Sequence, residues 1–298
     1  MQNKKTYKLY LILSLPILIL AIFSYYLLSP KRYAVFAGYN PNGTIEPYVI
    51  TYLEGLKEIT DGIVYITDSP INEKELQKLS HLPIIYQEHN RHNEYDWGSY
   101  KRGYNWLKEN KFLTYADELI FANDSTFAPI TSFKSMFYAM RLKPHLDFWG
   151  DLKNLKTTPH LQSYFLVFRP QVFNSPVFSD FINSIQHQPT RQDYINQYEL
   201  RLTQTLEKSG FRWDCYLPYD KLNTLPLHDK NTHPIKLIKD YNHQFIKRRT
   251  FTNGMIIIEK LPYIISYLKT HHPQTYNNIL HTKPLSPTTP TYNQKRDK

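Results

Sequence analysis

The chain has 298 residues, of which 41% are hydrophobic and 21% are charged. This balance is typical of globular proteins and excludes a chain that is disordered throughout. The sequence contains one cysteine, Cys215, which excludes an internal disulfide framework and a cysteine-rich metal cluster.

The net charge of +10 comes mainly from the two ends of the chain. Residues 1–32 hold five basic side chains and no acidic one, and residues 283–298 hold four basic and one acidic. Between these ends, 27 basic residues are balanced by 25 acidic ones. A domain so close to neutral lacks the basic footprint of a nucleic-acid-binding protein, so nucleic acid is not expected as a partner.

Residues 9–28 form an apolar stretch of 20 residues without a charge. At a rise of ~1.5 Å per residue, a helix of this length matches the ~30 Å hydrocarbon core of a bilayer. A signal peptide is the alternative, but the stretch is long for one and no small-x-small cleavage pattern follows it. The sequence therefore predicts one uncleaved transmembrane helix at residues 9–28, behind a basic flank at residues 1–8.

In the first half of the chain, short apolar runs alternate with amphipathic stretches. We expect a helix that begins at Pro47, further helices at residues 72–79, 100–107 and 133–140, and strands at residues 33–37, 63–67, 83–86 and 117–122. Helices between successive strands favour a mostly parallel sheet with helices on both faces.

The rhythm changes after Leu146. The pattern here predicts strands at residues 161–168 and 211–217, helices at 177–185, 194–206 and 259–268, a turn-rich segment at 223–234 and a strand-length apolar run at 255–258. Residues 284–291 are rich in Pro, Ser and Thr and are expected to be disordered. We therefore expect a folded domain at residues 33–282 and a basic tail at residues 283–298.

The sequence lacks the common motifs G-x-G-x-x-G, the P-loop, H-E-x-x-H and G-x-S-x-G. Its sharpest polar segment is Asn123-Asp124-Ser125, which directly follows an expected strand. Open α/β sheets bind ligands at this position, and a carboxylate beside an amide and a hydroxyl offers oxygen ligands to a Mg²⁺ or Mn²⁺ ion holding a diphosphate. The alternative is that the triplet is a turn that caps the next element.

Three further features combine carboxylates, amides and aromatic rings. In the segment 93–101, Asp96 either caps a helix or contacts a ribose or base. The segments 147–150 and 160–165 together suit a sugar site, or else form an aromatic core at the sheet edge. In the segment 198–203, Glu199 lies in an expected helix, as a general base or as a solvated charge.

Taken in order, these segments resemble the rhamnan synthesis protein F family of polysaccharide and lipopolysaccharide biosynthesis. The resemblance covers roughly residues 33 to 213, and its matching pieces are residues 34–43, 95–101, 123–125 with Pro129, 147–150, 160–168 and 198–203. The family looks like glycosyltransferases of the A-type nucleotide-sugar fold, in which a mixed, Rossmann-like sheet is flanked by helices. Some of its members are taken to be rhamnosyltransferases.

The resemblance implies a nucleotide-sugar donor and a growing or lipid-linked glycan as acceptor, a precursor of cell-surface polysaccharide or lipopolysaccharide. Asp124 would hold a divalent cation, Mg²⁺ or Mn²⁺, on the diphosphate, although the segment has one carboxylate where Asp-x-Asp has two. Glu199 would be the catalytic base, with Asp147 as second choice. Tyr39, Asp96, Trp97, Asn123, Asp124 and Ser125 would bind the donor, and His160 and Gln162 would contact the acceptor or donor sugar.

Nucleotide sugars are made in the cytosol, so the resemblance implies a single-pass protein of the bacterial inner membrane whose domain faces the cytoplasm. Two other classes of protein stay open. A non-catalytic glycan-binding or assembly protein could use the same fold. A phosphotransferase acting on cell-surface polymers would also use a metal and a membrane surface, but would release a nucleoside monophosphate.

Overall fold

The structure is a computed structural model that describes residues 30–155, 158–217, 222, 233–251 and 259–282. The chain divides into two units, residues 1–31 and 32–298, and the fold concerns the second. The expected transmembrane helix, the apolar run at 255–258 and the basic tail lie outside the described residues. Within the described ranges, no helix combines the length and the apolar character needed to cross a bilayer.

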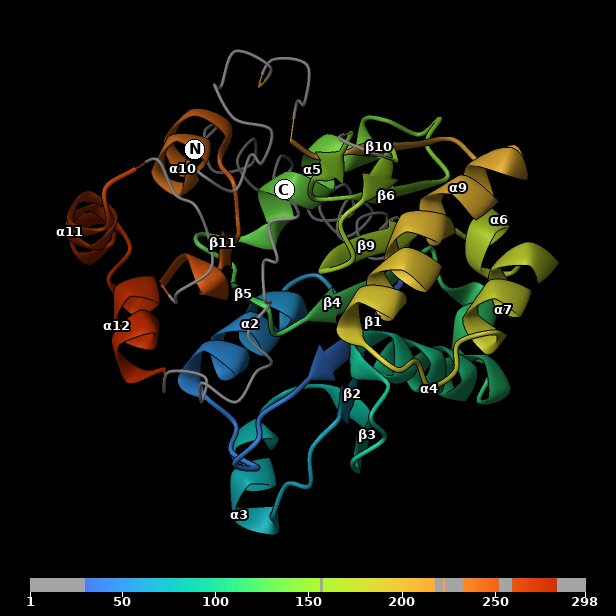
Figure 1. Cartoon of the computed structure of the whole chain (residues 1–298), viewed down its shortest axis with the longest axis horizontal. Helices are drawn as coiled ribbons and strands as arrows, with labels where there is room; N and C mark the ends of the chain where they lie inside the picture. The colour runs from blue at the N-terminus through green and yellow to red at the C-terminus, as the bar shows by residue number, and fades with distance from the viewer. Residues whose placement is uncertain (1–29, 156–157, 218–221, 223–232, 252–258, 283–298) are drawn as a thin grey trace, which may run out of the picture. The chain divides into compact units, whose positions relative to one another are not determined.

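A mixed sheet forms the centre of the domain (Figure 1). Among the described residues its strand order is β10-β6-β9-β4-β1-β2-β3. β9 runs antiparallel to both of its neighbours, and the other pairs are parallel. The strands are β1 (Arg32–Gly38), β2 (Gly62–Thr67), β3 (Ile84–His89), β4 (Glu118–Asn123), β5 (Thr126–Phe127), β6 (Phe148–Gly150), β7 (Lys153–Asn154), β8 (His160–Leu161), β9 (Phe165–Phe168), β10 (Trp213–Cys215) and β11 (Ile246–Lys247).

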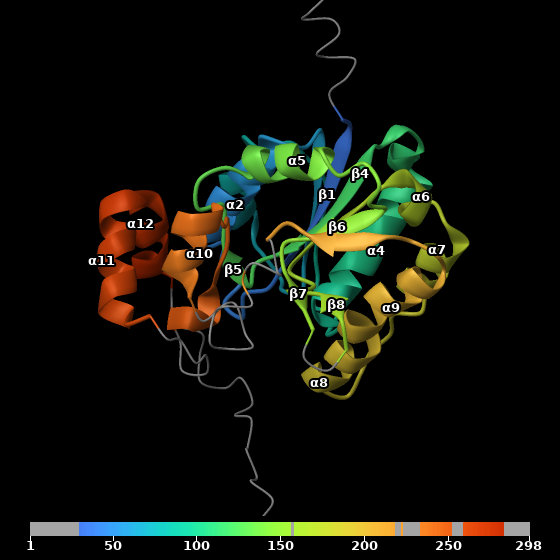
Figure 2. The ribbon, with the colours of Figure 1, turned by 90° about the horizontal axis from the view of Figure 1, so that it is seen from above.

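Helices cover both faces of this sheet, as Figure 2 shows from above. The helices are α2 (Pro47–Lys57), α3 (Glu73–Leu76), η1 (Gln77–Leu79), α4 (Tyr95–Glu109), η2 (Phe112–Tyr115), α5 (Phe133–Arg141), α6 (Pro170–Phe173), α7 (Pro176–Asn183), α8 (Arg191–Tyr194), η3 (Ile195–Glu199), α9 (Leu200–Lys208), α10 (Pro234–Tyr241), η6 (Arg248–Phe251), α11 (Leu261–His271) and α12 (Pro273–His281). The sequence prediction of an α/β fold is therefore confirmed, with β9 as the strand that departs from the expected parallel arrangement.

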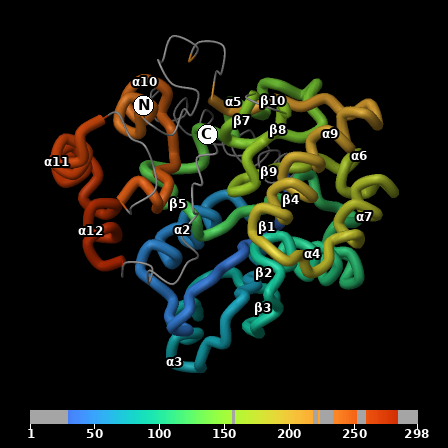
Figure 3. Tube along the Cα trace, viewed as in Figure 1, coloured from blue at the N-terminus to red at the C-terminus, as the bar shows by residue number. Residues whose placement is uncertain are grey.

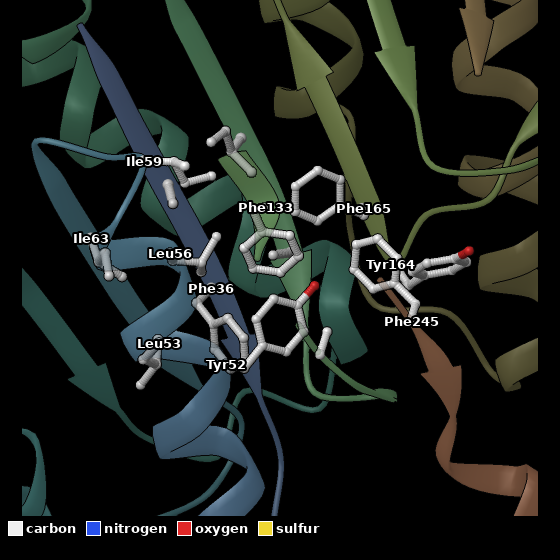
Figure 4. Packing of buried hydrophobic residues seen from close by; sticks show 14 of the residues in the cluster. Phe36, Tyr52, Leu53, Leu56, Ile59, Ile63, Phe133, Tyr164, Phe165 and Phe245 are labelled. Atoms are coloured by element: carbon white, nitrogen blue, oxygen red, sulfur yellow. The ribbon is translucent and has the colours of Figure 1, made fainter. Parts of the chain in front are cut away.

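Successive side chains of the central strands point to opposite faces of the sheet and pack into two separate hydrophobic cores. In β1, Phe36 points to the face covered by α2 and α5, whereas Val35 points to the face covered by α4, α7 and α9. Strands buried on both faces are apolar almost throughout, which is why their positions could be predicted from sequence. Figure 4 shows the first core, where Tyr52 and Phe133 from the helices pack among Phe36 and Phe165 from the sheet.

The C-terminal helices α10, α11 and α12 lie beside α2 and β5 at one end of the domain (Figure 3). They share a small apolar cluster that includes Ile235, Ile238, Ile264 and Leu268. The short strand β11 follows α10 and pairs antiparallel with β5, so that Lys247 lies opposite Thr126. This pairing places residues 246–247 next to the residues that follow β4.

Three expected elements differ from those in the structure. The expected helix 194–206 is interrupted by the π-helical turn η3 and continues as α9. The expected strand 161–168 is divided into β8 and β9, because the Gln162 backbone N–H turns to donate to the Leu152 carbonyl (2.9 Å). The expected helix 100–107 begins earlier, at Tyr95, so the segment that seemed to precede it is its first turn. The short strand β6 and the helix α12 were not predicted.

Candidate functional site

The carboxyl ends of β1, β2 and β4 define one edge of the sheet. β1 lies between β2 and β4. The strands that follow β1, as far as β3, are added on one side of it, and β4 is then added on its other side. Open α/β sheets bind ligands outside the strand ends at such a switch point. In register, Gly38 is paired with Thr67 and Ala37 with Asn123, so the residues that follow these three strands meet at this edge.

Asn123-Asp124-Ser125 forms the turn that leaves β4 at the switch point. The Asn123 Oδ1 accepts hydrogen bonds from the Ser125 backbone N–H (3.0 Å) and hydroxyl (2.6 Å). Asp124 is buried, and its Oδ2 accepts from the Tyr39 backbone N–H (2.9 Å) at the end of β1. Burial raises the pKa of Asp124, although Arg248 and the hydrogen bonds from Tyr39 and Tyr48 act in the opposite direction. The triplet is thus both the turn and a polar group at the ligand-binding edge.

Asp96 lies next to this turn, in the first turn of α4. The Asn123 Nδ2 donates to the Asp96 Oδ2 over 2.6 Å. The N-cap residue of α4 is Glu94, so the interpretation of Asp96 as a helix cap is wrong. Burial and the Asp124 charge raise the pKa of Asp96 to about 7, and Glu199 acts in the same direction. Carboxyl groups with pKa values near neutrality are concentrated at functional sites.

Glu199 lies near Asp96 and comes from a different part of the chain. It ends η3, a single π-helical turn between α8 and α9, and such turns are frequent at functional sites. The Ser163 hydroxyl donates to the Glu199 Oε2 (3.1 Å), and the His160 Nε2 lies 3.9 Å from the Glu199 Oε1. Tyr164, the residue after Ser163, accepts from the Asn123 backbone N–H (3.2 Å). Asp96, Asp124 and Glu199 are therefore brought together at one edge.

Two cationic residues, Lys247 and Arg248, face these carboxylates and were missed by the sequence reasoning. The Arg248 backbone N–H donates to the Ser125 carbonyl (3.0 Å), and its Nη1 donates to the Asp124 carbonyl (3.2 Å). Lys247 Nζ lies 3.5 Å from the centre of the Tyr164 ring. The run of three basic residues at 247–249, in a nearly neutral domain, was the signal that could have found them.

A buried hydrogen-bonded group formed by Asp151, Tyr164 and His243 was also missed by the sequence reasoning. The Asp151 Oδ2 accepts from the Tyr164 hydroxyl, and it lies 2.8 Å from the His243 Nε2. Asp151 is fully buried, and its Oδ1 and the His243 Nδ1 have no hydrogen-bond partner among the described residues. Asp151 follows the short strand β6, so a correct prediction of that strand would have placed its carboxylate at this edge.

On the other side of the switch point, Tyr39 and the loop before α4 line the edge. Tyr39 is partly exposed, and the Arg91 guanidinium lies 4.9 Å above its ring. Asp68, directly after β2, accepts from the backbone N–H groups of His92 (2.6 Å) and Asn93 (2.9 Å). Tyr39 and Asp124 line a cavity of about 10 Å³, which has room for one water. The cavity is too small to hold a nucleotide.

Two of the expected site residues, Trp97 and Asp147, have other surroundings. Trp97 is buried in the core against Tyr100, Phe181 and Tyr198, so it does not line a donor pocket. Gln162 is half-buried in the turn between β8 and β9, where its backbone holds that turn.

Asp147 lies at the opposite edge of the sheet, and this corrects its interpretation as the alternative base. It precedes β6, where Phe148 is in register with Phe168 of β9, and Phe168 is in register with Leu119 near the start of β4. Burial alone would raise the pKa of Asp147, but hydrogen bonds from the Arg212 backbone and from Gln171 outweigh it and lower the pKa. The carboxylate therefore serves as a buried structural acceptor.

The residues around Asp124 offer few protein ligands to a divalent cation. Hard cations take several oxygen ligands, and carboxylates are the strongest of them. Here the Asn123 Oδ1 and the Asp124 Oδ2 already accept hydrogen bonds, and the Arg248 guanidinium lies next to them. In the ranges that the structure describes, no three His, Cys, Asp or Glu side chains form a metal-binding group.

The fold and this edge define an α/β protein with a cluster of ionisable side chains at the switch point of a mixed sheet. The chain belongs to the rhamnan synthesis protein F family, which matches residues 63–285. The resemblance noted in the sequence is thereby confirmed, and the match extends further toward the C-terminus than the resembling segments do. A curated relative from Sinorhizobium fredii, an uncharacterised protein named y4gN, is 26% identical over 208 residues. The alignment covers 68% of this chain and 53% of that protein, so the chain spans about half of its length.

Several solved structures resemble the domain only distantly. A cytidylyltransferase from Leptospira borgpetersenii has a TM-score of 0.39 at 10% identity, over 86% of this chain and 99% of that one. A glycosyltransferase involved in glycosylation of the major capsid of PBCV-1 also has a TM-score of 0.39 at 10% identity, over 76% and 95%. Core-mannan synthase A from Aspergillus fumigatus, in a Mn/GDP form, has a TM-score of 0.31 at 8% identity, over 51% and 63%. These likenesses are too weak to assign an activity.

Proposed function

We propose that the protein is a glycosyltransferase of the A-type fold that moves a sugar from a nucleotide-sugar donor to a precursor of a cell-surface polysaccharide or lipopolysaccharide. Membership of the rhamnan synthesis protein F family supports polysaccharide synthesis as the process. The observation that carries the chemistry is the meeting of Asp96, Asp124 and Glu199 with Lys247 and Arg248 at the switch point of the sheet. Rhamnose is the sugar that the family name suggests.

The reaction we propose is a direct displacement at the anomeric carbon of the donor. The acceptor hydroxyl oxygen forms the new bond to that carbon, and the bond from the carbon to the diphosphate oxygen breaks. The nucleoside diphosphate leaves with the electron pair, and a carboxylate takes the hydroxyl proton. Glu199 is the proposed base because Ser163 and His160 hold its carboxylate at the edge while it stays partly accessible.

Donor and acceptor occupy different sides of the edge in this proposal. The nucleotide lies on the side of Tyr39 and Arg91, where an exposed ring and a cation border Asp124. The acceptor approaches from the side of His160 and Glu199. Asp96 lies between them, joined to Asn123, and its raised pKa suits a group that can hold or release a proton near neutral pH.

Glu199→Gln tests the assignment of the base. The variant keeps the shape of the side chain but cannot accept the proton, so turnover should fall about 10²-fold to 10⁴-fold while donor affinity changes little. Glu207→Gln, on the exposed side of the helix α9 that follows Glu199, is the matched control and should keep wild-type turnover. Unchanged turnover in Glu199→Gln would remove Glu199 from the chemistry. A parallel loss of donor affinity would make it a donor-binding residue.

A non-catalytic glycan-binding or assembly protein on the same fold is the second candidate, and the single carboxylate of Asn123-Asp124-Ser125 favours it. Such a protein would bind glycan but would not consume a nucleotide sugar.

We also propose that residues 9–28 anchor the chain as a single pass in a bacterial inner membrane. The domain would then face the cytoplasm, where nucleotide sugars are made. Protease added to the outer face of sealed membranes should leave the domain intact, and its digestion there would contradict this orientation.

A further inference from the structure

We infer that Arg248, with Lys247 beside it, binds the diphosphate of the donor and supplies the positive charge that a divalent cation would otherwise supply. This inference rests on the proposed use of a nucleotide donor. It goes further by assigning the phosphate-binding residues to the end of β11 and the start of η6, which the sequence motifs did not include.

The backbone fixes Arg248 against the polar turn after β4. β11 pairs antiparallel with β5, and the Arg248 N–H continues this pairing by donating to the Ser125 carbonyl (3.0 Å). The guanidinium lies 4.6 Å above the ring of Tyr48 and donates to the Asp124 carbonyl (3.2 Å). Two independent contacts thus hold the cation at the switch point where open α/β sheets bind ligands.

The loop that leads into β11 is itself firmly held. Gln244 is fully buried, and its Oε1 accepts from the Thr131 backbone N–H (2.9 Å) and hydroxyl (2.9 Å). His243 lies 2.8 Å from the Asp151 Oδ2, and Phe245 packs against Tyr164 and Phe165, as Figure 4 shows. Because residues 243–248 are held by these contacts, the side chains of Lys247 and Arg248 start from a fixed backbone. They would lose little conformational freedom when a ligand binds, which favours affinity.

The chemistry of the two groups fits a diphosphate. A guanidinium carries five N–H donors in a planar fork that matches phosphate oxygens, and it stays charged at any accessible pH. Among the described residues Arg248 uses one of these donations, to the Asp124 carbonyl. Lys247 lies next to it in sequence and contributes a second charge near Asp96, whose pKa it acts to lower. A fixed cation at this place would repel a divalent metal ion and replace its charge.

The test compares the binding of nucleoside, nucleoside monophosphate and nucleoside diphosphate to the full chain by titration calorimetry. Uridine, guanosine, thymidine, cytidine and adenosine series are measured, each in excess EDTA and again with Mn²⁺. The best diphosphate should bind more tightly than its nucleoside, and its affinity in EDTA should stay within about 3-fold of that with Mn²⁺. Arg248→Gln should lose about 10-fold to 100-fold in diphosphate affinity and little in nucleoside affinity.

Arg141→Gln, an exposed arginine on α5, is the matched control and should bind like the wild type. Since Arg248 also packs on Tyr48, Arg248→Lys and Lys247→Gln serve as second variants, with circular dichroism as the check of folding. Each should show a smaller loss, again confined to the diphosphate. Diphosphate binding that requires Mn²⁺, or that is unchanged in the folded variants, would overturn the inference and leave the transferase proposal standing. The absence of binding by every nucleotide would overturn both.

Discussion

Asp96 shows how much a single side chain depends on neighbours that are distant in sequence. Its carboxyl group accepts from Asn123 and shares the charges of Asp124 and Glu199, and burial together with these charges raises its pKa to about 7. The sequence indicated that Asp96 was important but suggested a cap or a ribose contact. The surroundings of Asp96 depend on the convergence of three chain segments, which no local pattern encodes.

The raised pKa makes the stability of the protein depend on pH in a defined direction. The unfolded carboxyl group titrates near pH ~3.9, so the folded state binds the extra proton between about pH 4 and pH 7. Stability from this group is present below about pH 4 and is lost as the pH rises through about 7. Asp96→Asn removes the titration, so its melting temperature relative to wild type should rise between about pH 4 and pH 7. Asp180→Asn, an exposed residue of α7, is the control. A difference between Asp96→Asn and wild type that is the same at every pH would contradict the assignment.

At the scale of elements, long buried strands and amphipathic helices were predictable, and short strands were not. β1, β2 and β4 have six or seven mostly apolar residues each, and runs of this kind can be recognised in a sequence. β6 has three residues, too few for a period to show, and its place in the sheet comes from pairing with β9 and β10. β10 also has three residues, but it lies inside the expected strand 211–217. The same difference explains which site residues were found from the sequence. Asn123 and Asp124 lie at the end of the predicted strand β4, whereas Asp151 and Arg248 follow β6 and β11, which were not predicted.

Helix α4 illustrates a second limit of sequence patterns. Its first turn combines an aromatic ring with a carboxylate, and the two point to different places. Asp96 reaches the site, while Trp97 packs in the core between the sheet and the helices η3 and α7. A one-residue step along a helix turns the side chain by about 100°, so neighbours in a motif need not share a role.

Trp97→Ala should therefore act on stability and leave donor recognition in the folded fraction unchanged. Removing a buried aromatic side chain costs about 3–5 kcal/mol in the free energy of unfolding, which denaturant titration measures. Tyr115→Ala is the control, because Tyr115 is 80% exposed and should change stability by less than about 0.5 kcal/mol. A stable Trp97→Ala protein that has lost nucleotide affinity would return Trp97 to the binding site.

At the scale of the whole molecule, charge and function are separated along the chain. The basic residues in excess lie at the ends, and the domain between them is nearly neutral apart from the cations that face its site. The transmembrane helix at residues 9–28 was inferred from the length of an uncharged apolar run and from the lack of a cleavage pattern after it, and it stays a prediction.

The central claim is that this edge of the sheet transfers a sugar and releases a nucleoside diphosphate. The most direct measurement incubates the purified full chain with nucleotide sugars carrying a labelled sugar and with a lipid-linked glycan acceptor, and counts both products. One nucleoside diphosphate should appear for each labelled sugar found on the glycan, and Asp124→Asn should reduce both by about 10²-fold to 10³-fold. Release of a nucleoside monophosphate would instead identify a phosphotransferase. Glycan binding without any release of nucleotide, across the full donor panel, would contradict the account and identify a binding protein.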